Sequence, residues 1–111
     1  MISFCTGDDL GVPRIPEALV VEWTEGESRV VFSFCKQGEA ITAHFAAGKD
    51  SLRRVKEAID DFVEWSLGAY PWAKMVLAVI GIKSVERIVK KIGFVYVSEA
   101  EGYQVYMRVR Q

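Results

Sequence analysis

Cysteine and histidine are scarce in this sequence, which holds two cysteines and one histidine. Cys5 and Cys35 lie far apart, no Cys-x-x-Cys pair occurs, and His44 has no cysteine close to it along the chain. Zinc sites need clusters of these residues at short spacings, so the sequence predicts no metal site. Two distant cysteines in a short chain are expected to remain free thiols.

Long hydrophobic runs and an excess of charge of one sign are also absent. The longest apolar run, Met75–Ile80, is far shorter than the roughly 20 residues that a membrane-spanning helix needs. The formal net charge is -1 with both signs mixed, which gives no long-range attraction to nucleic acid or to an anionic membrane. The first residues lack the basic-then-apolar pattern of a secretory signal. We therefore expect no nucleic-acid or membrane partner, and a cytoplasmic location.

The length and the apolar content of the chain are sufficient for one hydrophobic core. The chain has 111 residues, of which 50% are hydrophobic and 26% are charged. A chain of this length usually forms one domain and buries most of its apolar side chains. We expect residues 1–111 to fold as a single domain.

The N-terminal half predicts strands joined by tight turns. Residues 1–6 are compatible with a short strand, and residues 7–17 contain several glycines and prolines, which break regular structure. Three segments rich in β-branched and aromatic residues follow, separated by turns, at residues 18–24, 29–36 and 39–46. Short strands joined in this way predict an antiparallel meander.

A helix and a buried strand are expected next. Apolar residues recur at helical spacing from residue 52 to residue 67, and charged residues occupy the opposite face. Asp50 or Ser51 is expected to cap the start of this helix, and Gly68 to end it. Residues 73–80 are nearly all apolar, which is typical of a strand buried on both faces. Together with the preceding strand, they predict a β-α-β crossover.

The C-terminal part predicts a second helix and a hairpin. Ser84 is expected to cap a helix whose apolar stripe ends at Ile92, and Gly93 is expected to end it. Residues 94–98 and 103–110 flank a short turn and predict an antiparallel pair. The whole order of elements predicts an α+β fold with a mixed sheet.

A helix that ends in Lys91-Ile92-Gly93-Phe94 before a strand is the most specific motif of the chain. With this motif, within residues 79–94, the order of elements resembles the core of the GNAT superfamily of N-acetyltransferases. Residues 47–93 also resemble small GNAT-like proteins encoded by tailed bacteriophages. The resemblance implies a GNAT-like sheet that is truncated at its N-terminus, and a host-cytoplasmic location if the chain is phage-encoded.

In that superfamily, acetyl-CoA lies in a gap where two parallel strands splay apart, and the corresponding strands here end near Ala46 and Ile80. The pyrophosphate lies at the start of the following helix, where unpaired N–H groups and the helix dipole favour an anion. The resemblance assigns the acetyl-CoA site to Phe45, Ala46, Ala47, Gly48, Lys49, Asp50, Ser51 and Arg53.

Several positions depart from the family pattern. Phe45 takes the place of a glutamine or arginine, and Asp50 that of a small residue. Val89 stands where a tyrosine commonly protonates the departing thiolate, and Ile82 where an asparagine is common. Valine cannot donate a proton, so that route is absent. The resemblance thus implies a relative of the acetyl-CoA-dependent N-acetyltransferases that pairs acyl-CoA with an amine, with catalysis weak or lost.

Each candidate residue also has an ordinary structural explanation. His44 is either a general base for an amine or a strand histidine satisfied by a neighbour. Residues 48–51 either cradle phosphate or form a plain strand-to-helix turn. Trp65, Tyr70 and Trp72 either mark a partner surface or pack at the end of the first helix. The alternative function is a non-catalytic, phage-encoded module on the same fold, which binds another protein or belongs to a virion.

Overall fold

The computed structural model describes residues 1–13 and 16–110, apart from the side chains of residues 49 and 50. Within this part of the chain, all the predicted strands and both predicted helices are present, with bounds shifted by a few residues. In chain order the elements are β1 (Ile2–Phe4), β2 (Leu19–Glu25), β3 (Ser28–Gln37), β4 (Ala40–Ala47), the 3-10 helix η1 (Lys49–Arg54), α1 (Val55–Ala69), β5 (Met75–Ile80), α2 (Lys83–Lys91), β6 (Val95–Ala100) and β7 (Tyr103–Val109).

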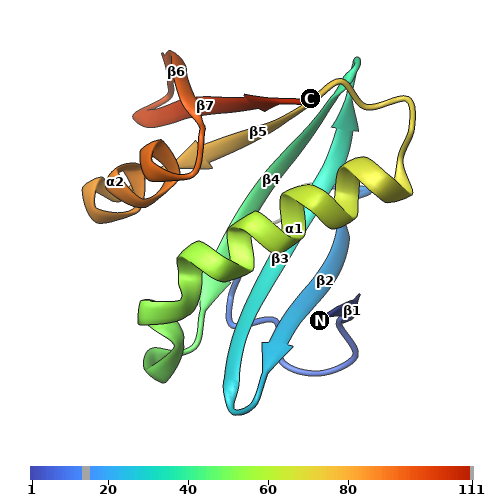
Figure 1. The fold of residues 1–111 in the computed structure, drawn as a ribbon, viewed down its shortest axis with the longest axis vertical. Helices are drawn as coiled ribbons and strands as arrows, with labels where there is room; N and C mark the ends of the chain where they lie inside the picture. The colour runs from blue at the N-terminus through green and yellow to red at the C-terminus, as the bar shows by residue number, and fades with distance from the viewer. Residues whose placement is uncertain (14–15, 111) are drawn as a thin grey trace.

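The strands form one mixed sheet in the order β1-β2-β3-β4-β5-β7-β6. Every neighbouring pair is antiparallel except β4 and β5, which are parallel and joined through α1. Figure 1 shows α1 lying across β3 and β4, with α2 beside β5, and both helices contribute to one core. The α+β class, the meander, the crossover and the C-terminal hairpin are therefore confirmed.

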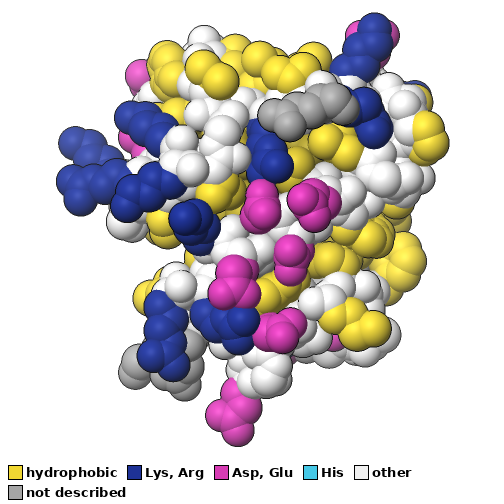
Figure 2. All heavy atoms as spheres, viewed as in Figure 1, with side chains coloured by type: hydrophobic (Ala, Val, Ile, Leu, Met, Phe, Trp, Pro, Cys, Tyr) yellow, Lys and Arg dark blue, Asp and Glu magenta, His cyan; other side chains and the backbone are white. Residues whose placement is uncertain are grey.

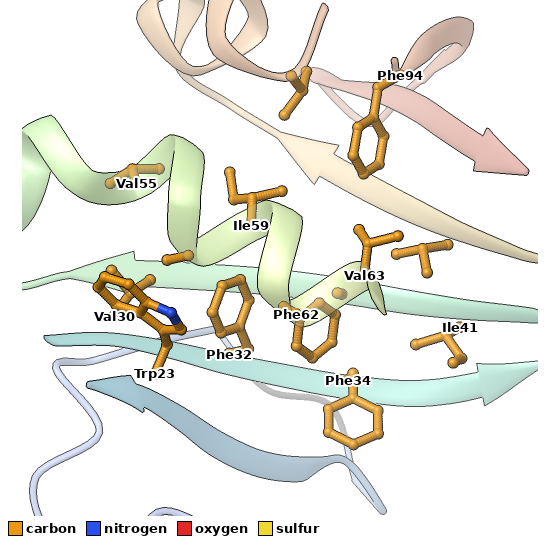
Figure 3. Packing of buried hydrophobic residues seen from close by; sticks show 14 of the residues in the cluster. Trp23, Val30, Phe32, Phe34, Ile41, Val55, Ile59, Phe62, Val63 and Phe94 are labelled. Carbon is orange, nitrogen blue, oxygen red and sulfur yellow. The ribbon is translucent and has the colours of Figure 1, made fainter. Parts of the chain in front are cut away.

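The core fills the space between the sheet and the helices (Figure 3). Phe32 of β3 stacks on Phe62 of α1 with ring centroids 4.4 Å apart. Trp23 is fully buried, and its indole N–H donates to the Asp61 carboxylate at 2.7 Å, so the one polar atom of this ring has a partner. On the opposite face of the sheet, the Ser33 hydroxyl donates to the carbonyl of Pro13. The segment between β1 and β2 therefore covers part of that face.

The aromatic residues at the C-terminal end of α1 divide between core and surface. Trp65 packs edge-on against Phe34 and Tyr70, with ring centroids 5.8 and 6.1 Å apart. Trp72 is 38% exposed, and the Lys36 ammonium lies 4.6 Å from its ring centroid. Packing at the helix end thus explains Trp65 and Tyr70.

Of the two caps predicted for the start of the first helix, Ser51 is not one. The chain enters α1 through η1, and neither element has a side-chain hydrogen bond that caps its N-terminus. The Ser51 hydroxyl accepts the backbone N–H of Arg29 at 2.7 Å instead, which ties η1 to the start of β3. The side chain of Asp50 lies outside the part of the chain that the structure describes.

The other helix ends also differ in part from expectation. Ser84 is not a cap, because α2 begins at Lys83 without a side-chain cap. Gly68 does not end α1, which continues through Ala69. Gly93 does end α2, with a φ of 93° that favours glycine, and the following Phe94 is buried.

The prediction that the strand at residues 73–80 is buried on both faces is only half right. Val76 and Ile80 of β5 are buried toward the helices. Met75, Leu77 and Val79 on the other face are half-buried. The difference arises because both helices lie on the same face of the sheet, which leaves β5 thinly covered on the other.

Candidate functional site

The sheet splits between its two parallel strands. The ladder between β4 and β5 runs from Ala40 paired with Met75 to Ala43 paired with Ala78 and then stops. Both strands continue, β4 alongside β3 and β5 alongside β7. The strands diverge beyond Ala43 and Ala78, and Figure 1 shows the resulting V. The strands that the sequence resemblance predicts to flank a gap therefore do diverge.

A pocket of about 420 Å³ occupies this gap. Its walls come from the diverging ends of β4 and β5, from η1, from the start of α2 and from β7. Most of the lining is apolar, and the polar side chains in it are those of His44, Ser84 and Tyr103. The lining residues are Pro13, His44, Phe45, Ala46, Ala47, Leu52, Val79, Ile80, Gly81, Ile82, Ser84, Val85 and Tyr103.

Backbone polar groups of β4 point into the gap. Gly48 donates its N–H to the carbonyl of Arg29 at 3.0 Å, so the backbone groups of residue 48 face β3. Along a strand these groups alternate in direction, so those of Phe45 and Ala47 face the opposite way, toward β5. The ladder with β5 has already ended at Ala43. In the described part of the chain no strand pairs with this edge of β4, so two N–H and two C=O groups border the pocket.

His44 lies on the wall of this pocket and is half-buried. It pairs with Ser33 across the β3–β4 ladder, on the face of the sheet away from the helices. Burial lowers the pKa of His44 from its ordinary value of 6.5. The imidazole is therefore neutral at pH 7 and carries a nitrogen that can accept a proton. Among the described residues, no hydrogen bond involves the His44 side chain. The alternative explanation, a strand histidine that is hydrogen-bonded to a neighbour, therefore finds no partner in that part of the chain.

The turn after β4 holds Gly48 in an ordinary backbone conformation. Gly48 has φ -61° and ψ 153°, which any residue adopts, and an added Cβ would meet its nearest atoms, the Arg29 carbonyl oxygen and Ser51 Oγ, at 3.5 Å. Neither conformation nor crowding thus requires glycine here. Ser51 is 2% exposed and its hydroxyl is engaged by Arg29, so it is a structural brace. The side chains of Lys49 and Asp50 are outside the described part.

Arg53 lies apart from the gap, in a groove of about 400 Å³ on the outer surface. The groove runs between α1 and the end of α2 and is lined by Arg53, Lys56, Glu57, Asp60 and Ile92. Its acidic residues have partners, since Glu57 pairs with Arg54 at 2.7 Å and Asp60 with Arg108 at 2.6 Å. Figure 2 shows Lys and Arg side chains gathered over α2 and over the N-terminal end of α1, on either side of a hollow.

Three residues at the mouth of the gap were not predicted from the sequence. Leu52 and Ile82 are 65% and 63% exposed and stand on its two sides. The ring of Tyr103 lies against Gly81, where an added Cβ would come within 3.1 Å of a ring carbon. Helical spacing placed Leu52 on the apolar face of the first helix, and this prediction is wrong, because Leu52 lies in η1 and is exposed. Ile82 directly precedes α2 and belongs to no periodic pattern of the sequence. Tyr103 reaches the gap only through the β5–β7 pairing, which periodicity does not reveal.

The structure thus brings part of the predicted site together. His44, Phe45, Ala46 and Ala47 line the gap, whereas Ser51 and Arg53 do not. Val89, which the sequence resemblance aligns with a proton-donating tyrosine, is fully buried in the core.

Cys5 and Cys35 are free thiols, and both are half-buried. Among the described residues there is no group of three or more His, Cys, Asp or Glu side chains that could hold a metal ion. Neither helix of that part is long and apolar enough to cross a membrane.

Comparison with known proteins does not assign this chain to a family. No protein-family model matches it, and no curated protein is significantly similar to it. The functional argument therefore rests on the geometry of the gap.

Proposed function

We propose that this protein binds acyl-CoA in the gap between β4 and β5, as a GNAT-type fold whose acyl transfer is weak or lost. The observation that carries the proposal is the split sheet. Two adjacent parallel strands continue past the end of their ladder, and a mostly apolar pocket of about 420 Å³ opens between them. Breaking a ladder leaves polar backbone groups without partners, which is costly unless water or a ligand satisfies them.

The backbone edge of β4 suits the pantetheine arm of CoA. That arm is a flexible chain with amide groups, which donate and accept hydrogen bonds as a peptide strand does. The N–H and C=O groups of Phe45 and Ala47 offer such a chain a strand to pair with. The apolar side chains around them, including Val79 and Ile80, match its methylene groups.

The surface beyond the gap suits the phosphates. Gly48 presents no side chain at the turn that follows β4, which leaves room for a bulky anion to approach the backbone. Arg53 and Lys56 lie in the groove further along, and Figure 2 shows further Lys and Arg side chains over α2. Glu57 and Asp60 in the groove are paired with arginines, which offsets their negative charge. The positive electrostatic potential of the other basic side chains in the groove therefore favours an anion.

An acyl-CoA supplies an acyl group activated on sulfur, which an amine can accept with release of the thiol. His44 is the residue of this chain that can take the proton from the amine, because its lowered pKa keeps it neutral near pH 7. Val89 has no proton to give, so the departing thiolate depends on water. Of the two proton transfers that acyl transfer usually needs, protonation of the departing thiolate thus has no side chain to carry it out. For this reason we propose that acyl transfer is weak.

Calorimetric titration with acetyl-CoA and with CoA tests the proposal. We expect micromolar binding of both ligands, and about tenfold weaker binding by Gly48→Ala, because the new methyl group crowds the phosphates. The conformation of Gly48 tolerates alanine, so this variant should keep its stability. Gly7→Ala is the matched control, since Gly7 has open space around it and is not among the residues that line the gap.

Absence of heat and of thermal stabilisation at about 1 mM ligand contradicts the proposal. Equal affinities of Gly48→Ala and Gly7→Ala would instead reject the phosphate position. If the protein binds acetyl-CoA, His44→Gln separates binding from acyl transfer. This variant should keep its affinity for acetyl-CoA while abolishing any transfer of the acyl group to an amine. Without binding, the protein-binding alternative is the one to pursue.

A further inference from the structure

The edge strand β6 is unusually exposed. All six of its residues are exposed, and Val95, Tyr96 and Val97 leave 59%, 51% and 48% of their surface to solvent. Eleven large apolar side chains are exposed among the described residues, and five of them belong to the β6–β7 hairpin. The opposite edge of the sheet, β1, has three residues. The β6–β7 hairpin thus carries almost half of these exposed side chains.

Features that normally protect a sheet edge are few in β6. Proteins blunt such edges with short strands, lysine, proline, bulges or a covering helix. Residues 95–100 contain no lysine and no proline, and the helices leave them uncovered. A bulge at Val97 is present, since Val97 has no counterpart in β7. It interrupts the ladder on the β7 side but leaves three consecutive apolar side chains at the surface.

The free side of β6 offers backbone groups for pairing. The hairpin closes with Ala100 opposite Tyr103 across a two-residue turn, and such closing pairs exchange hydrogen bonds. Alternation then turns the N–H and C=O groups of Glu99 away from β7. In the described residues no element lies beyond β6 to accept them.

Opposite charges lie at two places along this edge, on one face of the sheet. Tyr96 packs against Tyr106 with ring centroids 5.6 Å apart, and the Lys90 ammonium lies 5.8 Å from the Tyr106 centroid. Lys90 and Tyr96 therefore both lie at the Tyr106 ring, on the helix-bearing face. Glu99 is opposite Gln104, which shares that face with Tyr106, so Glu99 points to the same side nearer the hairpin turn.

We propose that β6 pairs with β6 of a second copy of this chain, antiparallel and about a two-fold axis perpendicular to the sheet. Such an axis keeps the helix-bearing faces of both copies on one side. A register that sets Tyr96 opposite Glu99 of the second copy brings Lys90 near that Glu99, and symmetry repeats the contact. The pairing covers the apolar side chains and joins two sheets into one.

Sedimentation equilibrium at about 100 μM tests the pairing, which does not depend on acyl-CoA binding. The wild-type chain should have the mass of a dimer, and Val97→Lys should have that of a monomer, because lysine on an edge opposes pairing. Phe4→Lys places the same charge on the exposed opposite edge and should leave the dimer intact. Circular dichroism should show that both variants remain folded.

Charge exchange gives a test that a loss of folding cannot mimic. Lys90→Glu and Glu99→Lys should each weaken self-association about tenfold or more, because each puts like charges together twice. An equimolar mixture of the two variants should regain the wild-type association, since every contact between unlike chains is then complementary. A monomeric wild type, an unchanged mass for Val97→Lys, or a mixture no stronger than its components would overturn the proposal.

Discussion

Replacing Ser51 with alanine should destabilise the fold without removing any charge or any large apolar side chain. Ser51 is 2% exposed, and its hydroxyl oxygen accepts the N–H of Arg29 at 2.7 Å. The carbonyl of the same Arg29 accepts the N–H of Gly48 at 3.0 Å. Both backbone groups of one residue therefore fasten the turn after β4 to the start of β3, and the substitution removes one of the two bonds.

The expected loss follows from leaving a partly buried N–H without an acceptor. Such a group costs about 1–3 kcal/mol of unfolding free energy. For a domain of about 100 residues, each kcal/mol lowers the melting temperature by about 4–8 °C. Urea and thermal unfolding followed by circular dichroism will measure both quantities.

A serine elsewhere in the same region provides the control. Ser84 is exposed and makes no hydrogen bond among those found in the described residues, so Ser84→Ala should change stability by less than about 0.5 kcal/mol. Equal stabilities of the Ser51 and Ser84 variants would refute the claim that the hydrogen bond from Arg29 to Ser51 stabilises the fold. If Ser51→Ala instead kept stability and lost affinity for CoA, the hydroxyl would belong to the phosphate site.

Three further predictions concern stability and pH. Gly93→Ala should lower the free energy of unfolding by about 1 kcal/mol or more, because the φ of residue 93 is 93°. Gly68 lies inside α1 with open space around it, so Gly68→Ala should raise the free energy of unfolding by about 0.5–1 kcal/mol. Chemical denaturation of both variants checks the contrast. Asp61→Ala should cost about 1–3 kcal/mol by stranding the indole N–H of Trp23, and Asp61→Asn should restore part of it, as tryptophan fluorescence during unfolding will show. Because burial lowers the pKa of His44, its contribution to stability is complete above pH 6.5 and is lost as the pH falls through the lower folded pKa; urea titrations at several pH values should show that His44→Gln flattens this dependence.

The order of elements could be predicted because each one has a local signal. Alternating β-branched residues, helical spacing of apolar residues and the turn glycines all act within a few positions. Gly93 illustrates this, since a helix end in the left-handed conformation favours glycine wherever the helix lies. The α+β class followed from the sequence of these local signals.

The site could be predicted only in part, because its remaining features depend on contacts between distant segments. The position of Ser51 along the chain predicts a helix cap, but in the folded protein its hydroxyl accepts the N–H of Arg29 at the start of β3. Tyr103 joins the gap through the register of β5 with β7. The exposure of β6 follows from its place at the end of the sheet, which no local pattern encodes.

Amide hydrogen exchange at Phe45 and Ala47 tests the central claim most directly. Their N–H groups face the gap beyond the end of the β4–β5 ladder, so in the free protein they should exchange faster than the paired amide of Ala43. Saturating CoA should slow exchange at both positions if pantetheine pairs with this edge. Unchanged exchange at Phe45 and Ala47 in the presence of CoA would contradict the claim that the gap is an acyl-CoA site.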